Sequence, residues 1–398
     1  MANKKPIKSK LQIDPVSGLA FYDMTRLLKC DAYYNIIFGG RSGGKTCESL
    51  EYGITQFVKS GYKDQFVYLR RWDEDIKGKS GGTIFDALID RNRISELTNG
   101  EYTTVLYRQR SYYLARYDEE LDKVVPMSYP FAHAFSLSRG VHYKSSSYPN
   151  VTSIIFDEFL TNGAYLVDEY VLFMNLISTI VRKDAKVKIF MIANTINKSS
   201  IYFTEMNIKK IIDKMEQGTI EQLKTQRGTT LAIEYCADGN TVSKVKTPSD
   251  VYFGFDNPNL KMITEGVWEI GTYPHCTIRY SPSDVRYYYF IIWDYDVLQC
   301  NIVKRDGCLF THIIRSNTQY EDIFTVNEET AQMKIISPGG TKHRVYCKNV
   351  TELPHWYTRL PKTRDKIGAY IAKFFIDEKV FYEDNEVGSI VQNYLNWC

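Results

Sequence analysis

The sequence has no long hydrophobic run. Its longest apolar stretch, residues 287–293, is far shorter than the ~18 residues that a membrane-spanning helix needs. The basic N-terminus, MANKKPIKSK, is not followed by the apolar segment that a signal peptide requires. There is no internal repeat and no low-complexity tract. From these absences we expect a soluble, cytoplasmic protein that makes no contact with a membrane.

Cysteine and histidine are too scattered to indicate a metal site. The 8 Cys and 6 His include no CxxC pair and no His at ligand spacing from a cysteine, which argues against zinc. We expect free buried thiols rather than disulfides. Neither sign of charge is in excess, because 50 Lys and Arg against 47 Asp and Glu give a net charge of +3. Any contact with nucleic acid must therefore come from a local basic patch.

The overall composition is that of a globular protein, with 44% hydrophobic and 24% charged residues. It excludes a disordered tail, a collagen-like fibre and a coiled coil. A length of 398 residues favours two domains. We expect the first domain at residues 1–240, a linker with the turn-forming sequence DNPN at residues 241–275, and the second domain at residues 276–398.

The first domain alternates predicted strands with predicted helices. Short apolar runs predict buried strands, and apolar residues at helical spacing predict the helices between them. The strands are expected at residues 33–38, 66–69, 131–137, 153–156, 188–192 and 231–235, the helices at 47–58, 166–181 and 208–215, and a hairpin at 102–117 around Gln109-Arg110. This alternation predicts an α/β fold, with a mostly parallel sheet and helices on both faces.

The sharpest motif follows the first of these strands. It is Gly39-Gly40-Arg41-Ser42-Gly43-Gly44-Lys45-Thr46, which matches G-x-x-x-x-G-K-[ST], the P-loop or Walker A pattern, between a strand and a helix. The glycines let backbone N–H groups turn toward phosphates, and the start of the following helix adds positive potential. Lys45 is expected to contact the β- and γ-phosphates of ATP, and the Thr46 hydroxyl to hold Mg²⁺. A chance glycine-rich turn is the alternative.

Two further strands end in polar residues. Residues 154–156 run into Asp157 and Glu158. An acid at the tip of a buried strand is costly unless a cation meets it, so Asp157 is expected to take Mg²⁺ through water. Glu158 would polarise the attacking water as general base. Asn194, after the next strand, is a candidate sensor of the γ-phosphate, with a simple turn asparagine as the alternative. Together with the P-loop, these residues predict ATP hydrolysis.

Taken in order, the motifs resemble the genome-packaging ATPases of small tailed phages, the phi-29-like relatives of the large terminases. The resemblance covers roughly residues 30–200. It rests on GGRSGGKT, on the strand that ends in Arg70-Arg71, on YKSSSYPNV at residues 143–151 leading into IIFDEF, and on the Asn194 strand. It implies a P-loop NTPase of the additional-strand, conserved-glutamate class. Such proteins form rings, here a pentamer, that drive viral double-stranded DNA through a portal into a prohead.

The resemblance also implies where the protein acts and what it meets there. The expected place is the host cytoplasm, docked on the prohead during assembly and absent from the mature virion. A structural packaging RNA is a further expected partner. In such rings a neighbouring subunit supplies a cation to the γ-phosphate. Lys144 and Arg182 fit this pattern, and Arg139 competes with Lys144, although each of them can also be an ordinary solvated charge. Arg41 would fold over the phosphates or bridge subunits.

A basic segment after the second strand is the candidate DNA contact. Residues 76–82 contain Lys77 and Lys79 among three glycines. We expect a flexible loop that faces the ring channel and holds DNA phosphates without reading the base sequence. A mobile surface loop without any such role is the alternative.

The second domain is expected to be a smaller α+β domain. Strands are predicted at residues 287–293 and 380–382, and a helix at 387–395. Large terminases carry an RNase H-like nuclease in this region, where clustered acids bind two metals. Asp294, Asp296, Glu383 and Asp384 follow the two strands, but the last helix offers no convincing acid beyond Glu386. We interpret the domain as a vestigial nuclease fold that contacts nucleic acid or the portal.

Three functions remain open from the sequence. The first is an ATP-driven DNA-packaging motor. The second is a large terminase with an active metal-dependent nuclease, which would nick plasmid DNA in the presence of Mn²⁺ or Mg²⁺. The third is an ATP-controlled adaptor that binds nucleic acid without translocating it, and whose hydrolysis would not respond to DNA, proheads or subunit mixing.

Overall fold

The fold is taken from a computed structural model of the chain. The described residues are 7–15, 17–41, 43–143, 148–161, 165–181, 187–195, 198, 200–239, 273–293, 296–316, 324–327, 332–335, 345–347 and 366–397. Ser42, Lys144, Arg182, Asp294 and the predicted turn at 256–259 lie outside them. The chain divides into two compact units. Unit 1 is Met1–Asn162, Leu166–Lys198 and Asn207–Glu269, and unit 2 is Gly163–Tyr165, Ser199–Met206 and Ile270–Cys398.

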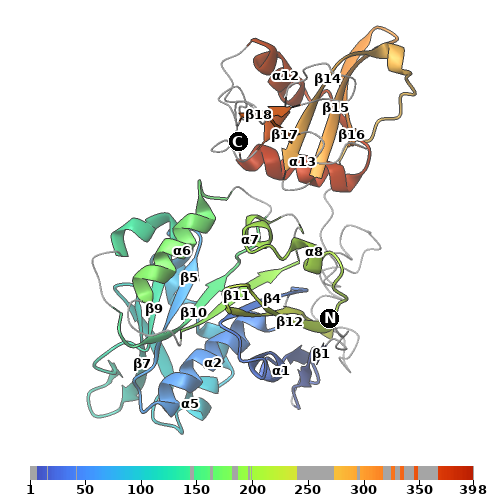
Figure 1. Cartoon of the computed structure of the whole chain (residues 1–398). Coiled ribbons are helices and arrows are strands. Elements are labelled where there is room, and N and C mark those ends of the chain that lie inside the picture. The colour runs from blue at the N-terminus through green and yellow to red at the C-terminus, as the bar shows by residue number, and fades with distance from the viewer. Residues whose placement is uncertain are drawn as a thin grey trace. The chain divides into compact units, whose positions relative to one another are not determined.

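Unit 1 is built around one mixed sheet (Figure 1). Its central strands are parallel and follow the order β13-β4-β11-β10-β5-β9. They span Thr230–Tyr235 (β13), Tyr34–Gly39 (β4), Lys188–Asn194 (β11), Val151–Asp157 (β10), Gln65–Arg70 (β5) and Ala132–Ser136 (β9). Each is a nearly continuous run of buried residues, as expected of parallel strands covered on both faces. The predicted α/β fold is confirmed.

Antiparallel strands complete both edges of this sheet. On the β13 side these are β12 (Thr219–Lys224) and β1 (Ile7–Lys8), and on the β9 side β7 (Ser111–Asp118), β6 (Thr104–Arg108) and β8 (Lys123–Pro126). Gln109 and Arg110 join β6 to β7 with φ values of 48° and 60°. Two successive positive φ values are typical of the tight turns that suit the twist of a hairpin. The predicted hairpin is confirmed.

Helices cover both faces of the sheet (Figure 1). The main ones in unit 1 are α2 (Lys45–Lys59) and α6 (Glu169–Ile180). Ile54 and Phe57 of α2 belong to the same buried cluster as Ile155. Phe173 of α6 lies 5.2 Å from Phe156, between ring centroids. Because successive residues of a strand point to opposite faces, the contacts of Ile155 and Phe156 put the two helices on different sides.

Shorter helices connect these elements. In unit 1 they are α1 (Thr25–Leu28), the 3-10 helix Glu74–Ile76, α3 (Lys79–Gly82), α4 (Asp86–Asp90), α5 (Arg93–Leu97), the 3-10 helix Leu137–Tyr143 and α8 (Lys209–Ile212). Unit 2 contributes α7 (Ile201–Glu205). α8 is shorter than the helix predicted at residues 208–215. The helix ends at Ile212, and the residues between it and β12 are not helical.

The segment after β5 is not the flexible loop that we expected. It contains the 3-10 helix and α3, and Ile76 is completely buried. The Tyr107 hydroxyl donates to the Ile76 carbonyl, and the Tyr112 hydroxyl donates to the Gly81 carbonyl at 3.0 Å. A Cβ at Gly81 would lie 2.3 Å from the Ile76 carbonyl oxygen. The expectation was wrong because the glycine serves close packing rather than flexibility.

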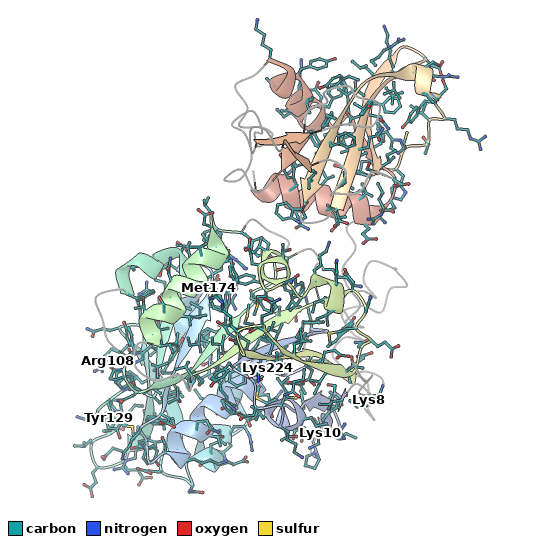
Figure 2. All side chains as sticks on the ribbon, in the orientation of Figure 1. Lys8, Lys10, Arg108, Tyr129, Met174 and Lys224 are labelled. Carbon is teal, nitrogen blue, oxygen red and sulfur yellow. The ribbon has the colours of Figure 1, made fainter. Side chains whose placement is uncertain are left out.

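The N-terminal residues form a small hairpin that the sequence analysis did not predict. β2 (Leu11–Ile13) pairs with β3 (Ala20–Tyr22). Lys10, labelled in Figure 2, forms an ion pair with Asp23 at 2.5 Å. Strands of three residues are too short for an alternating pattern to stand out in the sequence. The hairpin nevertheless brings β3 beside the glycine-rich motif, as described below.

Unit 2 contains a second mixed sheet in the order β19-β14-β15-β16-β20. β14, β15 and β16 are antiparallel, whereas β19 runs parallel to β14 and β20 parallel to β16. The strands span Val285–Trp293 (β14), Asp296–Arg305 (β15), Cys308–Arg315 (β16), Val345–Cys347 (β19) and Val380–Tyr382 (β20), with β17 (Phe324–Asn327), β18 (Gln332–Ile335), the 3-10 helix Pro282–Asp284, α12 (Lys366–Ile376) and α13 (Asn385–Trp397). The predicted strands and final helix are confirmed, and Trp293 and Tyr394 lie in the core.

The state of the cysteines and the character of the helices can be read from the described residues. The cysteines whose side chains are described are all free thiols, as expected, but only Cys30, Cys236 and Cys300 are buried; Cys47 and Cys276 are partly buried, and Cys308 is exposed. Within the same part of the chain, no helix has both the length and the apolar character needed to cross a membrane.

Candidate nucleotide-binding site

The predicted site residues meet at the carboxyl ends of three neighbouring strands. β11 lies between β4 and β10, and all three are parallel. In the β-ladder, Asn194 pairs with Gly39, and Ile192 pairs with Asp157. Parallel strands end at the same edge of a sheet, so the glycine-rich loop, the amide and the acid are brought together there. This is the crevice position at which open α/β sheets bind ligands.

The loop turns sharply into α2. Gly44 precedes the helix with φ of 81°, a left-handed conformation that favours glycine. A Cβ at Gly39 would lie only 2.8 Å from the Cβ of Cys236. The backbone N–H of Tyr22, in β3, donates to the Gly43 carbonyl at 2.8 Å. The N-terminal hairpin thus holds the loop in place. The first N–H groups of an α-helix have no partner within the helix, so those of α2 can bind an anion.

Lys45 lies almost fully buried beneath the loop. Its ammonium donates to the carbonyls of Gly40 and Gly39 at 2.5 and 3.3 Å, and to Oδ1 of Asn194 at 3.4 Å. Burial lowers the pKa of Lys45, while the nearby negative charge of Asp157 acts in the opposite direction. The contacts fix the cation at the centre of the loop and link it directly to the end of β11.

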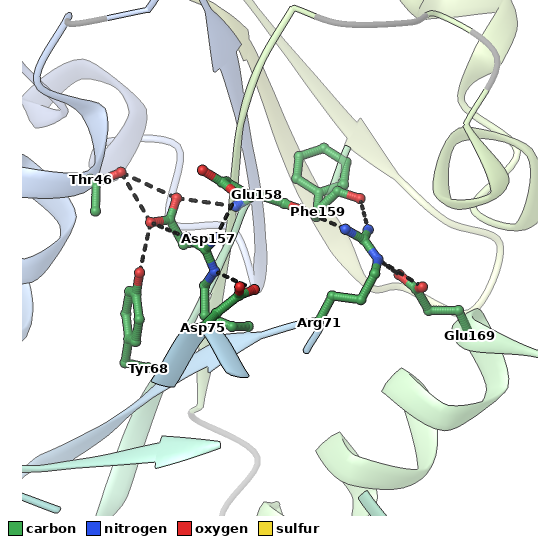
Figure 3. Close-up of polar contacts among 9 residues, drawn as sticks. Thr46, Tyr68, Arg71, Asp75, Asp157, Glu158, Phe159 and Glu169 are labelled. Carbon is green, nitrogen blue, oxygen red and sulfur yellow. Dashed lines mark hydrogen bonds and ion pairs between the residues drawn. The ribbon is translucent and has the colours of Figure 1, made fainter. Parts of the chain in front are cut away.

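Thr46, Asp157 and Tyr68 form a chain of hydrogen bonds (Figure 3). The Thr46 hydroxyl lies 3.2 and 3.3 Å from the two carboxylate oxygens of Asp157. The hydroxyl of Tyr68, from the middle of β5, donates to Oδ2 of Asp157 at 2.9 Å. Burial raises the pKa of Tyr68 well above its ordinary value, so this hydroxyl remains a donor. The sequence analysis identified Thr46 and Asp157 but missed Tyr68, whose strand position suggested only a core residue.

Glu158 turns away from the strand that precedes it. Its φ of 57° is left-handed, and its side chain is 58% exposed. Arg70 holds its carboxylate at 2.5 Å and also lies 3.6 Å from Asp157 and 3.4 Å from Asp75. Arg70 therefore bridges the predicted general base Glu158, the predicted metal-binding Asp157 and a third carboxylate. The sequence showed Arg70 only as the end of a strand.

Arg71 points the other way, into the protein (Figure 3). Its Nε donates to both carboxylate oxygens of Glu169 at 3.0 and 2.8 Å. Its terminal nitrogens donate to the carbonyls of Glu158 and Phe159 at 3.1 and 2.6 Å. Glu169 begins α6, a position where an acid ordinarily suits the helix dipole, so nothing in the sequence marked it as a partner of Arg71.

A pocket of about 400 Å³ lies beside the loop. It is lined by Phe21, Gly43, Gly44, Lys45, Thr46, Cys47, Arg91, Asp157, Glu158, Ile192, Ala193 and Asn194. Arg41 lines a second pocket with Arg70, Glu158 and Asn194. Arg41 is exposed and sits on the side of the loop where Asn194 and Glu158 also lie. Phe21 and Arg91 were not predicted, because neither belongs to a motif.

The remaining predicted residues lie elsewhere or outside the described part. Lys77 and Lys79 are exposed, Lys79 as the first residue of α3 and Lys77 two residues before it. Arg139 lies 3.7 Å from Asp73, which also binds Arg110 at 2.7 Å. Contacts with Arg110 hold the pKa of Asp73 below its ordinary value. Ser42, Lys144 and Arg182 lie outside the described residues.

Three of the predicted acids of unit 2 contact one arginine, whereas Asp384 accepts from the backbone N–H of Val387 at 2.8 Å. Arg315, at the end of β16, contacts Glu386 at 2.8 Å and Asp296 at 3.9 Å. The backbone N–H of Arg315 donates to the Glu383 carboxylate at 2.8 Å. Among the residues that the structure describes, no group of three or more His, Cys, Asp or Glu is arranged to hold a metal ion. Asp294 lies outside that part of the chain.

The overall fold is shared with solved phage packaging motors. The structure described as the Phi-28 gp11 DNA packaging motor aligns with 95% of this chain and 97% of its own, with a TM-score of 0.53 and 17% identity. The bacteriophage Phi-29 viral genome packaging motor assembly aligns with 93% of this chain and 97% of its own, with a TM-score of 0.51 and 17% identity. At this level of identity the similarity concerns the fold.

Sequence comparison places the chain in a family. The family model for the Podovirus DNA encapsidation protein (Gp16) matches residues 17–221, slightly more than half of the chain. This protein belongs to that family, which confirms the resemblance drawn from its motifs. The DNA packaging protein of Bacillus phage phi29 is 27% identical over 197 residues, which cover 49% of this chain and 52% of the relative. The match thus spans about half the length of that relative.

Proposed function

We propose that this protein is an ATP-driven motor that moves viral double-stranded DNA through the portal into a prohead. It works as a ring whose ATP sites are shared between subunits. The observation that carries the proposal is the convergence of Lys45, Thr46, Asp157 and Asn194 beside a glycine-rich loop, in a member of the Podovirus DNA encapsidation family. The position of β11 between β4 and β10 supports the additional-strand, conserved-glutamate class of P-loop NTPases.

The loop would bind the phosphates of ATP. Gly39, Gly40, Arg41, Ser42, Gly43 and Gly44 would provide the turn that Lys45 and Thr46 complete. The Lys45 ammonium is held at the loop by the Gly39 and Gly40 carbonyls and by Asn194. These contacts use all three of its N–H donors, so Lys45 would exchange at least one of them for the β- and γ-phosphates. Asn194 contacts Lys45 and would register the γ-phosphate at the end of β11.

Glu158 would act as the general base for hydrolysis. Its exposed carboxylate would take a proton from water as the water oxygen attacks the γ-phosphorus. The bond from that phosphorus to the bridging oxygen then breaks, which gives ADP and inorganic phosphate. Arg70 holds one oxygen of Glu158 at 2.5 Å. Proton transfer requires a carboxylate oxygen turned toward the attacking water, so the Arg70 contact has to rearrange or leave the second oxygen free.

Oxygen atoms at the base of the loop fit Mg²⁺. The Thr46 hydroxyl lies 3.2 Å from the nearly buried Asp157 carboxylate, and Mg²⁺ prefers such hard oxygen ligands. Thr46 and Asp157 are therefore the residues that would hold it. When bound with ATP, the ion would neutralise part of the charge on the phosphates.

A neighbouring subunit would complete each site. Lys144 or Arg182, with Arg139 as a further candidate, would bring a cation to the γ-phosphate, a role worth roughly 10³–10⁵ in rate. Arg139 is half exposed and only loosely paired with Asp73, so it could be redirected toward a partner. Arg41 would fold over the phosphates or reach the adjacent subunit.

The partners follow from the family. The ring, a pentamer, would dock on the portal of the prohead in the host cytoplasm, with a packaging RNA as an additional contact, and would leave before the virion matures. Lys77 and Lys79, exposed at the start of α3, remain candidates for contact with the DNA backbone. A nearly neutral chain is compatible with such a local contact.

Unit 2 would be a vestigial RNase H-like nuclease that contacts nucleic acid or the portal. The order β16-β15-β14-β19, with β19 parallel to β14, supports this fold. The contacts of Arg315 with Asp296 and Glu386 argue against an active two-metal centre, because a guanidinium lies where the acids would have to bind metal cations. A terminase with a working nuclease is therefore the weaker candidate.

Steady-state ATP hydrolysis on proheads with DNA tests the proposal. Glu158→Gln protein is mixed with wild type in rising fractions at constant total concentration. Shared sites predict that the rate falls more steeply than the wild-type fraction. A strictly proportional fall would support subunits that hydrolyse ATP alone, and a rate indifferent to DNA and proheads would support an adaptor.

A matched variant controls for the handling of mixed subunits. Glu120→Gln makes the same chemical change at an exposed position in the turn between β7 and β8. It is expected to leave the rate unchanged at every mixing ratio. Glu158→Gln alone should still bind ATP, since Lys45 and the loop are untouched.

A further inference from the structure

Two chemically different groups of residues line the pocket beside the loop. Asp157, Glu158 and Asn194 form a polar group, and Phe21 and Arg91 form an aromatic and cationic group. If the proposed function holds, the γ-phosphate lies beside the polar group, because this group includes Glu158, the proposed general base. The remaining lining, which includes Phe21 and Arg91, is then available to the rest of the nucleotide.

Phe21 is fixed against the start of α2. It lies in β3, and the N–H of the next residue, Tyr22, donates to the Gly43 carbonyl at 2.8 Å. A Cβ on Gly44 would lie 3.2 Å from Cδ1 of the Phe21 ring. The ring is only half-buried. A positioned aromatic ring therefore stands directly beside the residues that begin the phosphate-binding helix.

Arg91 adds a planar cation to the same place. Its guanidinium carbon lies 4.7 Å from the centroid of the Phe21 ring, a cation–π contact. Arg91 sits between α4 and α5 and is exposed. Aromatic rings and guanidinium planes are the surfaces on which nucleobases stack in proteins.

We propose that Phe21 and Arg91 form the platform for the base of the nucleoside triphosphate. The inference rests on the proposed function, because it takes the phosphates to lie on the loop. It adds a second half to the site: the loop, Lys45 and Thr46 bind the triphosphate, and Phe21 and Arg91 bind the base. The two halves can be separated by ligands that carry one chemical group or both.

The test compares ATP with inorganic tripolyphosphate, which lacks the base and the ribose. Affinities are measured by competition against labelled ATP, on the full chain carrying Glu158→Gln so that ATP is not consumed. Phe21→Ala is expected to weaken ATP binding by about 5- to 150-fold, the usual range for loss of one stacked base. Tripolyphosphate affinity should change less than about twofold. An equal loss for both ligands, or no loss for ATP, would overturn the proposal.

Phe21→Leu keeps the inference testable if the alanine variant does not fold. Leucine preserves apolar packing against Gly44 but has no aromatic face. It should weaken ATP binding as Phe21→Ala does. Recovery of wild-type affinity would mean that the side chain only packs, and the platform would be rejected. Arg91→Gln should also weaken ATP more than tripolyphosphate.

A remote aromatic substitution provides the control. Tyr117→Ala removes an exposed ring from β7, outside the pocket lining, and should change neither affinity. Failure of the proposed function looks different from failure of this inference. If the protein without the Phe21 substitution binds neither ATP nor tripolyphosphate, the proposed function falls and the platform with it.

Discussion

Arg71 and Glu169 form a buried ion pair between the end of β5 and the start of α6. Their side chains are 5% and 0% exposed, and Nε of Arg71 reaches both carboxylate oxygens. The same guanidinium holds the carbonyls of Glu158 and Phe159. The Arg71 side chain thus links the turn after β10 to α6, which covers the face of the sheet opposite α2. We infer that its role is to position the Glu158 turn.

Removing one partner of this pair should be more harmful than removing both. Arg71→Met leaves the Glu169 carboxylate buried without its cation, which typically costs about 3–5 kcal/mol. The double variant Arg71→Met, Glu169→Leu should lose less, because no charge is left unpaired. Urea unfolding of the full chain measures both. Even when it is folded, the double variant should hydrolyse ATP more slowly than wild type, because the Glu158 carbonyl has lost its donor. Strictly additive losses, or normal hydrolysis, would contradict the positioning role.

Tyr68→Phe should alter the response to Mg²⁺. The substitution removes the hydroxyl that donates to Asp157 and keeps the ring in the core. Loss of an outer hydrogen bond to a metal-binding carboxylate typically costs about 10- to 100-fold in metal affinity. We therefore expect half-maximal ATP hydrolysis at about tenfold higher Mg²⁺. Tyr112→Phe, which loses a hydroxyl bonded to the Gly81 carbonyl, should leave the Mg²⁺ dependence unchanged. Identical Mg²⁺ curves for wild type and Tyr68→Phe would count against the assignment of Asp157.

Glu234 should make stability depend on pH. Burial raises the pKa of this carboxyl from 4.5 to about 7. The folded state then binds the proton more tightly than the unfolded state, so the contribution is complete below pH 4.5 and is lost as pH rises through 7. Between these limits the free energy of unfolding should fall by up to about 3 kcal/mol on this account.

Glu234→Gln isolates that contribution. Glutamine does not titrate but can still accept from the Tyr22 hydroxyl, which lies 2.7 Å from Glu234. Burial also raises the pKa of Glu48 to about 7 and adds a slope of the same sign in both proteins. We therefore measure the free energy of unfolding of wild type and variant between pH 4.5 and 8 and take the difference between the two proteins at each pH. Parallel curves would show that Glu234 titrates normally.

Unit 2 should not cut DNA. Arg315 lies among the acids that would have to bind the metals, 2.8 Å from Glu386 and 3.9 Å from Asp296, so we expect wild-type protein to leave supercoiled plasmid intact in Mn²⁺. Arg315→Ala removes one positive charge beside these acids and should increase Mn²⁺ binding, measured by titration calorimetry, because a cation close to carboxylates opposes the binding of a second cation. Nicking by wild type that Asp296→Ala abolishes would instead establish an active nuclease.

Local patterns predicted much of unit 1. The buried strands, α2 and the hairpin at Gln109-Arg110 follow from apolar runs, helical spacing and turn chemistry, all of which act within a few residues. Lys45, Thr46 and Asp157 could also be predicted, because parallel strands that end in polar residues must bring them to one edge.

Contacts between distant residues could not be predicted in the same way. Arg71 and Glu169 are 98 positions apart, and an acid at a helix start has a local explanation that hides the long-range one. Phe21 reaches the pocket only through a three-residue strand. The glycines near Lys79 suggested mobility, whereas Gly81 allows a tight turn against Ile76. In each case tertiary packing decides, and a single sequence does not display it.

The residues that precede the glycine-rich loop have a practical consequence for cutting the protein into parts. β1 caps the edge of β12, Ser9 and Tyr22 supply the hydroxyls that meet Glu234, and Tyr22 also anchors Gly43. A truncation that starts at β4 would strip two donors from a buried carboxyl and bare a strand edge. Fusion junctions and affinity tags therefore belong ahead of residue 7, and the shortest fragment of unit 1 that keeps these contacts has to begin there.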